Sequence, residues 1–257
     1  MKDVVFDIET EREFREVGGK ENMHLLGVSV VGVYRYADDS LVAYEKEELP
    51  LLESVFKDAR LVGFNSKHFD VPVLAPHLSF DIYALEHLDL MTGIEQSLGF
   101  RVSLDNLCRA TLGKGKSAVG LDAITWWRSG QKEKVKEYCL ADVELTRDLY
   151  EFGKKHDFVF CDTRDKGRVK IPVMWREAEP APKKVLQDAF ARRLSVEIEY
   201  ETGESRRVDI QKLNSNSFVG FCHTRQGKRV FYFDRVMKAV LTSDSYVIEN
   251  DVQRSLI

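Results

Sequence analysis

A short apolar segment near the start of the chain, residues 4–8, runs into two acids in alternation, with Asp7 and Glu9 on either side of Ile8. Its valines and phenylalanine predict a buried strand. Side chains of a strand alternate between its faces, so Asp7 and Glu9 point the same way. Two buried carboxylates repel each other and are costly to desolvate, which favours a cation between them. The strand core contains no Lys or Arg, so a divalent metal with oxygen ligands fits that need. The alternative is that the strand simply runs out into solvent at Asp7.

The length and composition exclude several protein classes. A chain of 257 residues with 44% hydrophobic residues is long enough for one large domain, or for a medium and a small one, and is not expected to be disordered. No apolar run is long enough to cross a bilayer and the N-terminus lacks a signal-peptide pattern, so we expect a cytoplasmic protein without a membrane partner. The four cysteines are scattered, which favours reduced thiols over a zinc site or disulfides.

The charge is uneven along the chain. The formal net charge is −4, which by itself does not indicate nucleic-acid binding. From Lys183 to the end, 13 Lys and Arg stand against 10 Asp and Glu, a net charge of +3. The acidic excess therefore lies in the part of the chain that holds the two alternating acids.

The order of the predicted elements indicates an α/β fold. Residues 25–36 and 41–44 read as strands that form an antiparallel meander with the first strand. Residues 47–57 have helical periodicity, and residues 61–64 read as a further buried strand. Strands interrupted by a helix in this way predict a mixed sheet with flanking helices.

Helices dominate the next part of the chain. Residues 88–112 read as helix, turn and helix, broken at Gly99 and capped by Ser103. The basic loop at 113–116 lacks the pattern of a phosphate-binding loop and is interpreted as a plain loop, with contact to the substrate as the alternative. A short helix follows at 123–127, and its two tryptophans are interpreted as core residues. A long helix over 132–154 and a hairpin over 158–175 complete this part.

Two more acids are candidate ligands. Asp70 follows the fourth predicted strand, where a helix is expected to begin near Phe69 with Asn65 or Ser66 as its cap. An acid in the first turn of a helix also suits the helix dipole, so Asp70 has a purely structural alternative.

On the long helix, Tyr138 and Asp142 are four residues apart and share one face. Leu145 and Leu149 lie near that face and direct it toward the core. A carboxylate on a core-facing stripe is unusual without a partner, and a metal would supply one.

Residues 177–182 are polar and contain two prolines, so a domain boundary is placed there. A short helix at 185–193 follows, and then five short strands separated by turn signals, as expected for a small barrel or sandwich. The predicted strands are 196–200, 206–213, 218–223, 228–233 and 236–242.

Three sequence blocks now occur in order: Phe6-Asp7-Ile8-Glu9-Thr10, Phe64-Asn65 followed by Phe69-Asp70, and Tyr138 followed by Asp142. Over roughly the first two-thirds of its length the chain resembles the DEDD exonucleases of the RNase H-like fold. The spacing of the third block is similar to that of the tyrosine subtype. In the histidine subtype the base stands one position earlier, where this chain has Glu137.

The resemblance implies a set of catalytic residues: Asp7, Glu9, Asp70, Tyr138 and Asp142. The four acids would hold two divalent ions, Mg2+ or Mn2+, about 4 Å apart. Asp7 would bridge the ions, Glu9 and Asp142 would hold the one that carries the attacking water, and Asp70 the other. Tyr138 would orient that water or accept a proton from it, and a phenol pKa of about 10 favours orientation unless the metals lower it.

The resemblance also implies the substrate. It is a nucleic acid with a free 3′ end, expected to be single-stranded DNA, which Asn65 would contact and from which nucleoside monophosphates would be released. RNA is an alternative substrate, because the residues that would read the 2′-hydroxyl are not identified. A nucleic-acid- or ligand-binding regulatory protein on an inactive nuclease scaffold is the alternative function.

The tail resembles a WYL domain, a small Sm-like or SH3-like β-barrel. Tyr200 ends its first strand, and residues 229–236 match the late arginine-rich signature, whereas the aromatic triplet is degenerate at 218–220. Arg225, Arg229 and Arg235 are candidate contacts to nucleic acid or to a nucleotide ligand. The alternative is that they are ordinary solvated charges. The expected domains are an exonuclease domain at 1–176, a linker at 177–184 and a WYL-like domain at 185–257.

Overall fold

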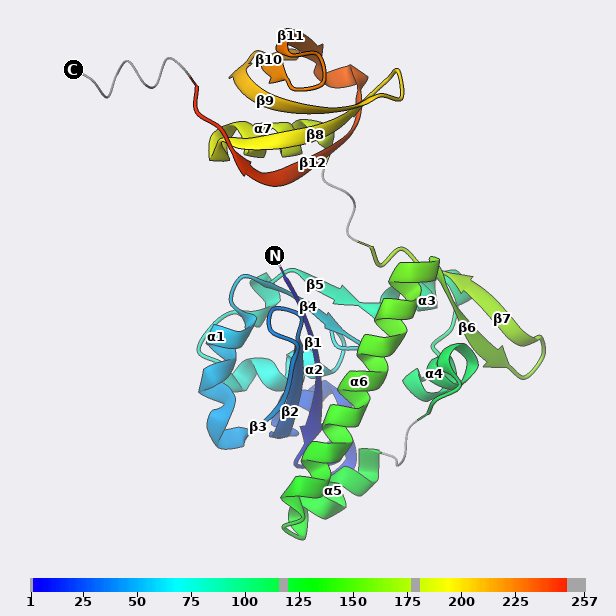
Figure 1. Ribbon diagram of the computed structural model, residues 1–257. Coiled ribbons are helices and arrows are strands. Elements are labelled where there is room, and N and C mark those ends of the chain that lie inside the picture. The colour runs from blue at the N-terminus through cyan, green and yellow to red at the C-terminus, as the bar shows by residue number, and fades with distance from the viewer. Residues whose placement is uncertain (1, 116–119, 177–180, 249–257) are drawn as a thin grey trace. The chain divides into compact units, whose positions relative to one another are not determined.

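The computed structural model describes residues 2–115, 120–176 and 181–248 (Figure 1). The chain divides into two compact units, Met1–Arg176 and Glu177–Ile257. The strands of the first unit are β1 (Lys2–Thr10), β2 (Val28–Arg35), β3 (Ser40–Glu45), β4 (Ala59–Gly63), β5 (His87–Asp89), β6 (Phe158–Thr163) and β7 (Gly167–Pro172). Its α-helices are α1 (Leu52–Phe56), α2 (Asp70–Leu74), α3 (Leu90–Leu98), α4 (Leu104–Leu112), α5 (Gly120–Arg128) and α6 (Lys132–His156).

The central sheet has the strand order β3-β2-β1-β4-β5. Strands β1, β2 and β3 form the predicted antiparallel meander, and β4 runs parallel to both β1 and β5. The predicted mixed sheet with flanking helices is therefore confirmed. Strand β5 was not predicted, because three residues are too few to show a period of two.

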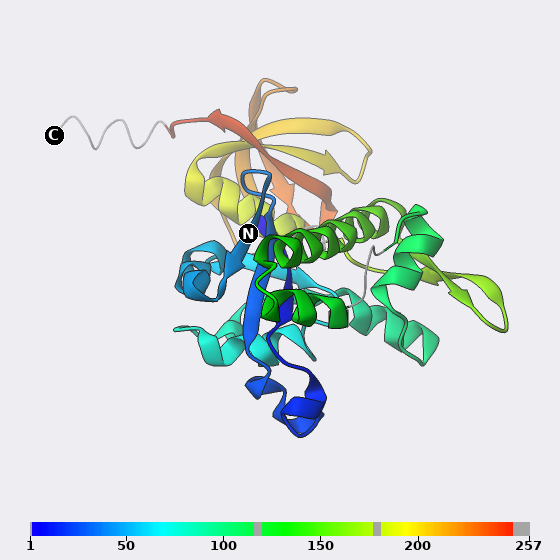
Figure 2. The same cartoon turned by 90° about the horizontal axis from the view of Figure 1, so that it is seen from below.

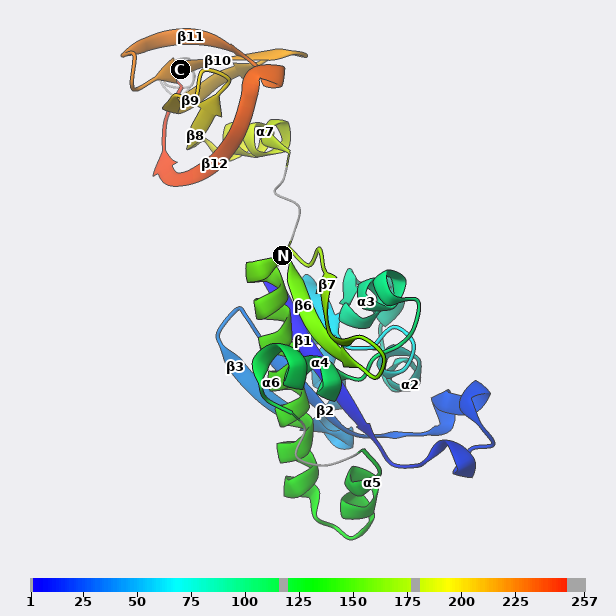
Figure 3. The ribbon, with the colours of Figure 1, turned by 90° about the vertical axis from the view of Figure 1, so that its right-hand side faces the viewer.

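The two faces of β1 pack against different helices. Val4, Phe6 and Ile8 belong to one apolar cluster, together with residues of α1 and α2. Val5 faces the other way and joins a cluster that includes residues of α4 and α6. Figure 3 shows α6 and α2 on opposite sides of the central strands. The alternation thus directs Asp7 toward the side that α6 covers.

Helix α6 lies close against β1 and β2, and α5 packs beside it (Figure 2). The approach depends on Gly32, which pairs with Asp7 across the two strands. A Cβ at Gly32 would lie 2.9 Å from both the Sγ of Cys139 and a methyl group of Val143 on α6. A glycine at this position therefore lets the helix approach the sheet.

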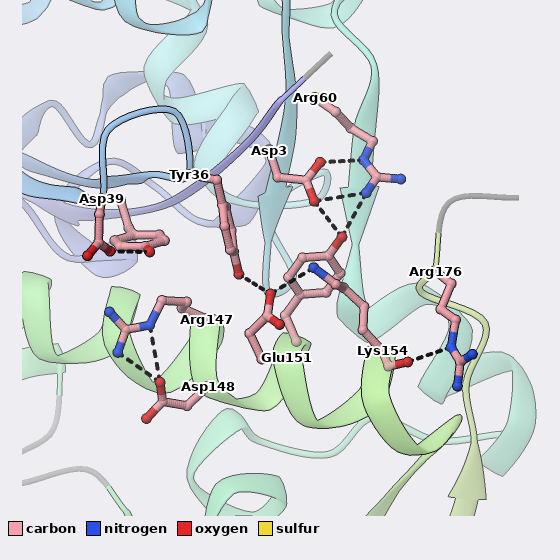
Figure 4. Close-up of polar contacts among 11 residues, drawn as sticks. Asp3, Tyr36, Asp39, Arg60, Arg147, Asp148, Glu151, Lys154 and Arg176 are labelled. Carbon is pink, nitrogen blue, oxygen red and sulfur yellow. Dashed lines mark hydrogen bonds and ion pairs between the residues drawn. The ribbon is translucent and has the colours of Figure 1, made fainter. Parts of the chain in front are cut away.

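A hydrogen-bonded cluster ties the far end of β1 to β4 and α6 (Figure 4). Arg60 donates to both carboxylate oxygens of Asp3, at 2.8 and 2.9 Å, and the hydroxyl of Tyr150 donates to Asp3 at 2.6 Å. Burial raises the pKa of Asp3, but hydrogen bonds from Arg60 and Tyr150 outweigh it and hold the pKa below its ordinary value. The cluster fixes the position of α6 relative to the sheet.

In the first unit, two helix ends follow the sequence signals and one does not. Gly99 ends α3 in the left-handed conformation, and Ser103 caps α4 by accepting from the N–H of Asn106. The predicted cap of α2 by Asn65 or Ser66 is wrong, since the residue before this helix is Phe69 and no side chain caps it.

The second unit consists of α7 (Pro182–Arg192) and five strands, β8 (Leu194–Tyr200), β9 (Ser205–Leu213), β10 (Ser217–Cys222), β11 (Gly227–Tyr232) and β12 (Val236–Ser245). Helix α7 begins earlier than predicted, inside the expected linker 177–184, because proline suits the first position of a helix. The strand order is β11-β10-β9-β8-β12. Among the described residues the pairings leave β11 and β12 as edges, so they show an all-β sheet and no closed barrel.

In the described part of the chain, no helix combines the length and the apolar character that crossing a membrane requires.

Candidate active site

Three acids lie close together where α6 packs against β1. Each of Asp7, Glu9 and Asp142 offers a carboxylate oxygen, and these three oxygens lie within 4.8 Å of one another. Glu9 and Asp142 are buried, at 7% and 2% exposure, whereas Asp7 is half-buried. The strand brings Asp7 and Glu9 to one face, and the helix adds Asp142. An acid that lies at least 133 positions later in the sequence therefore shares one site with the two acids of the strand.

Asp70 reaches the same place from the opposite side of the sheet. It is the first residue of α2 and is 3% exposed. Its Oδ1 accepts a hydrogen bond at 3.2 Å from the backbone N–H of Ile8, the residue between the two acids of β1. Asp70 is not one of the three acids with oxygens within 4.8 Å, but it lines the same pocket as they do.

Tyr138 also lines this pocket, one turn before Asp142 on α6. It is 5% exposed, and its ring packs edge to face against Trp126 of α5, with centroids 6.0 Å apart. The ammonium of Lys134 covers Trp126 at 4.0 Å. Trp126 thus supports the tyrosine ring. Trp126 and Trp127 are partly buried and pack against a core cluster, so they are less buried than the core residues that the sequence predicts.

The pocket has a volume of about 540 Å³, within the roughly 300–1,000 Å³ typical of ligand sites. Sequence reasoning missed one of its walls, formed by the 3-10 helix Phe14–Glu16 and the residues before it. Phe14 packs edge to face on Phe69, with ring centroids 5.9 Å apart, and Arg12 and Arg15 line the pocket beside it. The available signal was a single phenylalanine in the charged segment 11–21, which reads as a loop.

Cys139 of α6 lies next to the acid cluster, and its thiol is affected by the negative charge of the acids. Burial raises the pKa of this thiol well above its ordinary value, and the charges of Asp7 and Glu9 raise it further. Its Sγ donates to the backbone oxygen of Asp7 at 3.5 Å. The same potential that disfavours a thiolate favours a cation.

The acids fit a hard divalent cation. Their donor atoms are carboxylate oxygens, which Mg2+ and Mn2+ prefer. Their gathering into one pocket, with three oxygens within 4.8 Å, supplies the close set of ligands that such an ion requires. A cation would also offset the repulsion among the carboxylates.

Asn65, the predicted nucleic-acid contact of the first unit, lines the pocket in the left-handed conformation, with φ at 63°. Its side-chain oxygen accepts a hydrogen bond from Arg101. The structure therefore brings Asn65 together with the four acids and Tyr138.

The three predicted arginines of the second unit have different surroundings. Arg225 forms an ion pair with Glu204 at 3.3 Å, and Arg235 forms one with Glu201 at 3.2 Å. Arg229 is exposed on β11, opposite Gly220 of β10. These placements agree with ordinary solvated charges for two of the three, and nucleic-acid binding by this set remains a prediction.

Comparison with known proteins identifies the family of the first unit. None of the curated proteins matches the chain. Among solved structures, proteasome accessory factor B/C (PafBC) of Arthrobacter aurescens matches with 16% sequence identity, over 60% of this chain and 22% of that chain, at a TM-score of 0.24. So low a TM-score supports no conclusion on fold or function. The family model of the RNase H superfamily matches residues 4–152, more than half of the 257 residues and a range that includes all four acids and Tyr138. The chain therefore belongs to the RNase H superfamily.

Proposed function

We propose that residues 1–176 form a metal-dependent 3′→5′ exonuclease, of the tyrosine subtype of the DEDD exonucleases, that releases nucleoside monophosphates from single-stranded DNA. The observation that carries the proposal is the meeting of Asp7, Glu9 and Asp142, whose oxygens lie within 4.8 Å, in a pocket that Asp70 and Tyr138 also line. Membership of the RNase H superfamily supports a nucleic acid as the substrate.

In the proposed reaction the four acids would hold two Mg2+ or Mn2+ ions. When bound, the ions supply an activated water and stabilise the leaving 3′ oxygen. Tyr138 orients the water by hydrogen bonding, since a phenol is a poor general base near neutral pH. Its packing against Trp126 holds the ring in place, which reduces the reorganisation that the reaction requires.

The wall formed by Phe14 and Phe69 suits a nucleobase. Aromatic rings stack on any base, so such a wall binds a terminal nucleotide without reading sequence. Arg12, Arg15 and Asn65 line the same pocket and suit the sugar and phosphate groups. Together these residues supply a subsite for the nucleotide that is removed.

A cleavage assay tests the proposal. Purified protein with Mn2+ or Mg2+ is expected to shorten 5′-labelled single-stranded DNA from its 3′ end and to release nucleoside monophosphates, which chromatography identifies. Asp7→Asn and Asp142→Asn should abolish cleavage while the circular dichroism spectrum stays unchanged. Glu144→Gln is the matched control, because Glu144 is an exposed acid on the same helix.

The same assay separates the alternatives. RNA of the same sequence tests the sugar preference. Wild-type protein that leaves both substrates intact, yet still binds them, would favour a nucleic-acid-binding regulatory protein on a nuclease scaffold. Metal-dependent cleavage that survives in either aspartate variant would contradict the assigned site.

For the second unit we propose a WYL-like domain at 185–257 that binds nucleic acid or a nucleotide ligand. It follows the expected linker 177–184, whose last residues form the first turn of α7. Helix α7, the five-stranded sheet and the net charge of +3 counted from Lys183 support the proposal. Arg229→Ala in the full chain should weaken DNA binding and lower the salt slope by about 1. Arg192→Ala on α7 is the control. Equal affinities at every salt concentration would mean that Arg229 binds no phosphate.

A further inference from the structure

Another buried acid, Asp89, lies at the end of β5 and lines no part of the pocket described above. It is 3% exposed. Its carboxylate accepts hydrogen bonds from the backbone N–H groups of Asn65 at 2.8 Å, Lys67 at 2.9 Å and Met91 at 3.0 Å. One buried carboxylate therefore joins the loop after β4 to the start of α3.

The residue between the two bonded amides is fixed as well. Ser66 is fully buried, and its hydroxyl is hydrogen bonded to the Nε2 of His87 at 2.8 Å. Burial lowers the pKa of His87 to about 4, and the nearby Lys67 contributes, so the imidazole is neutral at pH 7. A Cβ at Gly63 would lie 2.4 Å from the Ser66 hydroxyl, so the glycine leaves room for this arrangement.

The same loop leads directly into the metal site. The carbonyl of Ser66 accepts a hydrogen bond at 2.9 Å from the N–H of Val71, in the first turn of α2. That turn contains Asp70, which accepts from the N–H of Ile8 on β1. The loop is thus held by β5 on one side and by β1 on the other. Asn65 of this loop and Asp70 directly after it both line the pocket, and these two attachments hold the segment that joins them.

We propose that Asp89 is a positioning residue of the exonuclease reaction, which holds the loop of residues 65–69 so that Asp70 and Asn65 enter the pocket. The inference rests on the proposed function. Asp89 acts through the backbone of the loop and touches neither metal nor substrate. Partners that orient metal ligands govern metal affinity in many sites, and Asp89 acts one step further out, through the backbone of the loop that leads into Asp70. A purely structural role, as the cap of α3, is the competing explanation.

The test measures Mn2+ binding directly as well as cleavage. Asp89→Asn keeps the size of the side chain but loses the charge and replaces one acceptor oxygen by an NH2 donor. We expect it to weaken Mn2+ binding, measured by electron paramagnetic resonance, by about 10- to 100-fold and to raise the Mn2+ concentration needed for half-maximal cleavage in parallel. Ser103→Ala is the matched control, because it removes the cap of the neighbouring helix α4 without touching the loop.

A second variant covers the case in which Asp89→Asn does not fold. Ser66→Ala removes one hydroxyl and opens no large cavity, and it should shift the same Mn2+ midpoint in the same direction by a smaller factor. If the folded variants bind Mn2+ like the Ser103→Ala control while wild-type protein binds Mn2+ and cleaves, the positioning role is refuted and the proposed function stands. If wild-type protein neither binds Mn2+ nor cleaves, the proposed function fails, and the inference fails with it.

Discussion

The acid cluster predicts that the site destabilises the protein when no metal is bound. Three carboxylate oxygens lie within 4.8 Å of one another, and two of the acids are buried. Two unit charges at that distance repel by about 3.5 kcal/mol at an effective dielectric constant of 20. The loss of folding stability from this repulsion has an upper limit, because an acid of the cluster can take up a proton instead. Keeping an ordinary aspartate neutral at pH 7 costs about 4 kcal/mol.

Asp142→Asn removes one charge from the cluster and keeps the shape of the side chain. In EDTA the variant should therefore be more stable than wild-type protein, by about 1–3 kcal/mol once hydrogen bonding and local relaxation reduce the full repulsion. For a unit of this size the gain corresponds to a rise in melting temperature of roughly 2–12 °C. Mn2+ should reverse the order, because an ion at about 1,000 times its Kd stabilises wild-type protein by about 4.1 kcal/mol and the variant lacks one of the metal-binding acids.

Thermal unfolding with EDTA and with Mn2+, for wild-type protein and two variants, measures both effects. Glu144→Gln is the control, because it removes an acid from the same helix at a residue whose side chain is 51% exposed, and surface changes of this kind stay within about 0.5 kcal/mol. The reasoning is refuted if Asp142→Asn is less stable than Glu144→Gln in EDTA. It is also refuted if Mn2+ stabilises the Asp142→Asn variant as much as wild-type protein.

Three further predictions concern the surroundings of the site. Gly32→Ala should reduce cleavage and stability together, because its Cβ would lie 2.9 Å from two side chains of α6. Gly93→Ala is the control: the space around its Cβ is open, so cleavage should be unchanged in the same assay. Asp3→Asn should cost about 3–5 kcal/mol at pH 7 in urea unfolding, since it breaks the buried ion pair between Asp3 and Arg60. Because the pKa of Asp3 is lowered in the folded state, its contribution is present above the unfolded pKa of about 3.9 and is lost as the pH falls through the folded pKa, so the two proteins should converge in acid. Phe14→Ala should raise KM for single-stranded DNA with little change in kcat, corresponding to the loss of about 1–3 kcal/mol of base stacking, and an unchanged KM would exclude this wall from substrate binding.

Local periodicity accounts for the part of the site that could be predicted from sequence. A period of two puts Asp7 and Glu9 on one face of a strand, and a spacing of four puts Tyr138 and Asp142 on one face of a helix. That these faces meet is a tertiary fact. Periodicity shows only that each face is apolar around its acids. The expectation that the faces of β1 and α6 meet came from the ordered set of three motifs.

Each feature that sequence reasoning missed has its own physical reason. Asp89 acts on backbone N–H groups, which leave no pattern in side-chain identity, and it lies on a strand of three residues. Phe14 owes its place to a 3-10 helix within a charged segment that reads as a loop. The start of α7 at Pro182 was misplaced because a proline before a helical pattern suits both a stiff linker and the first turn of a helix.

The architecture explains why an unfavourable cluster of acids can persist. Three parallel strands, β1, β4 and β5, end on the same side of the sheet, and each end contributes one component: two acids, a loop that carries Asp70, and the carboxylate that holds that loop. The fourth component comes from α6, which the Asp3–Arg60 cluster and the close approach at Gly32 hold against the sheet. These attachments lie outside the acid cluster, so the fold holds the acids close together although they repel one another. A bound cation removes that repulsion, and the free energy released adds to the affinity for the metal. Metal affinity should therefore fall when an attachment is weakened, even though every metal ligand is still present.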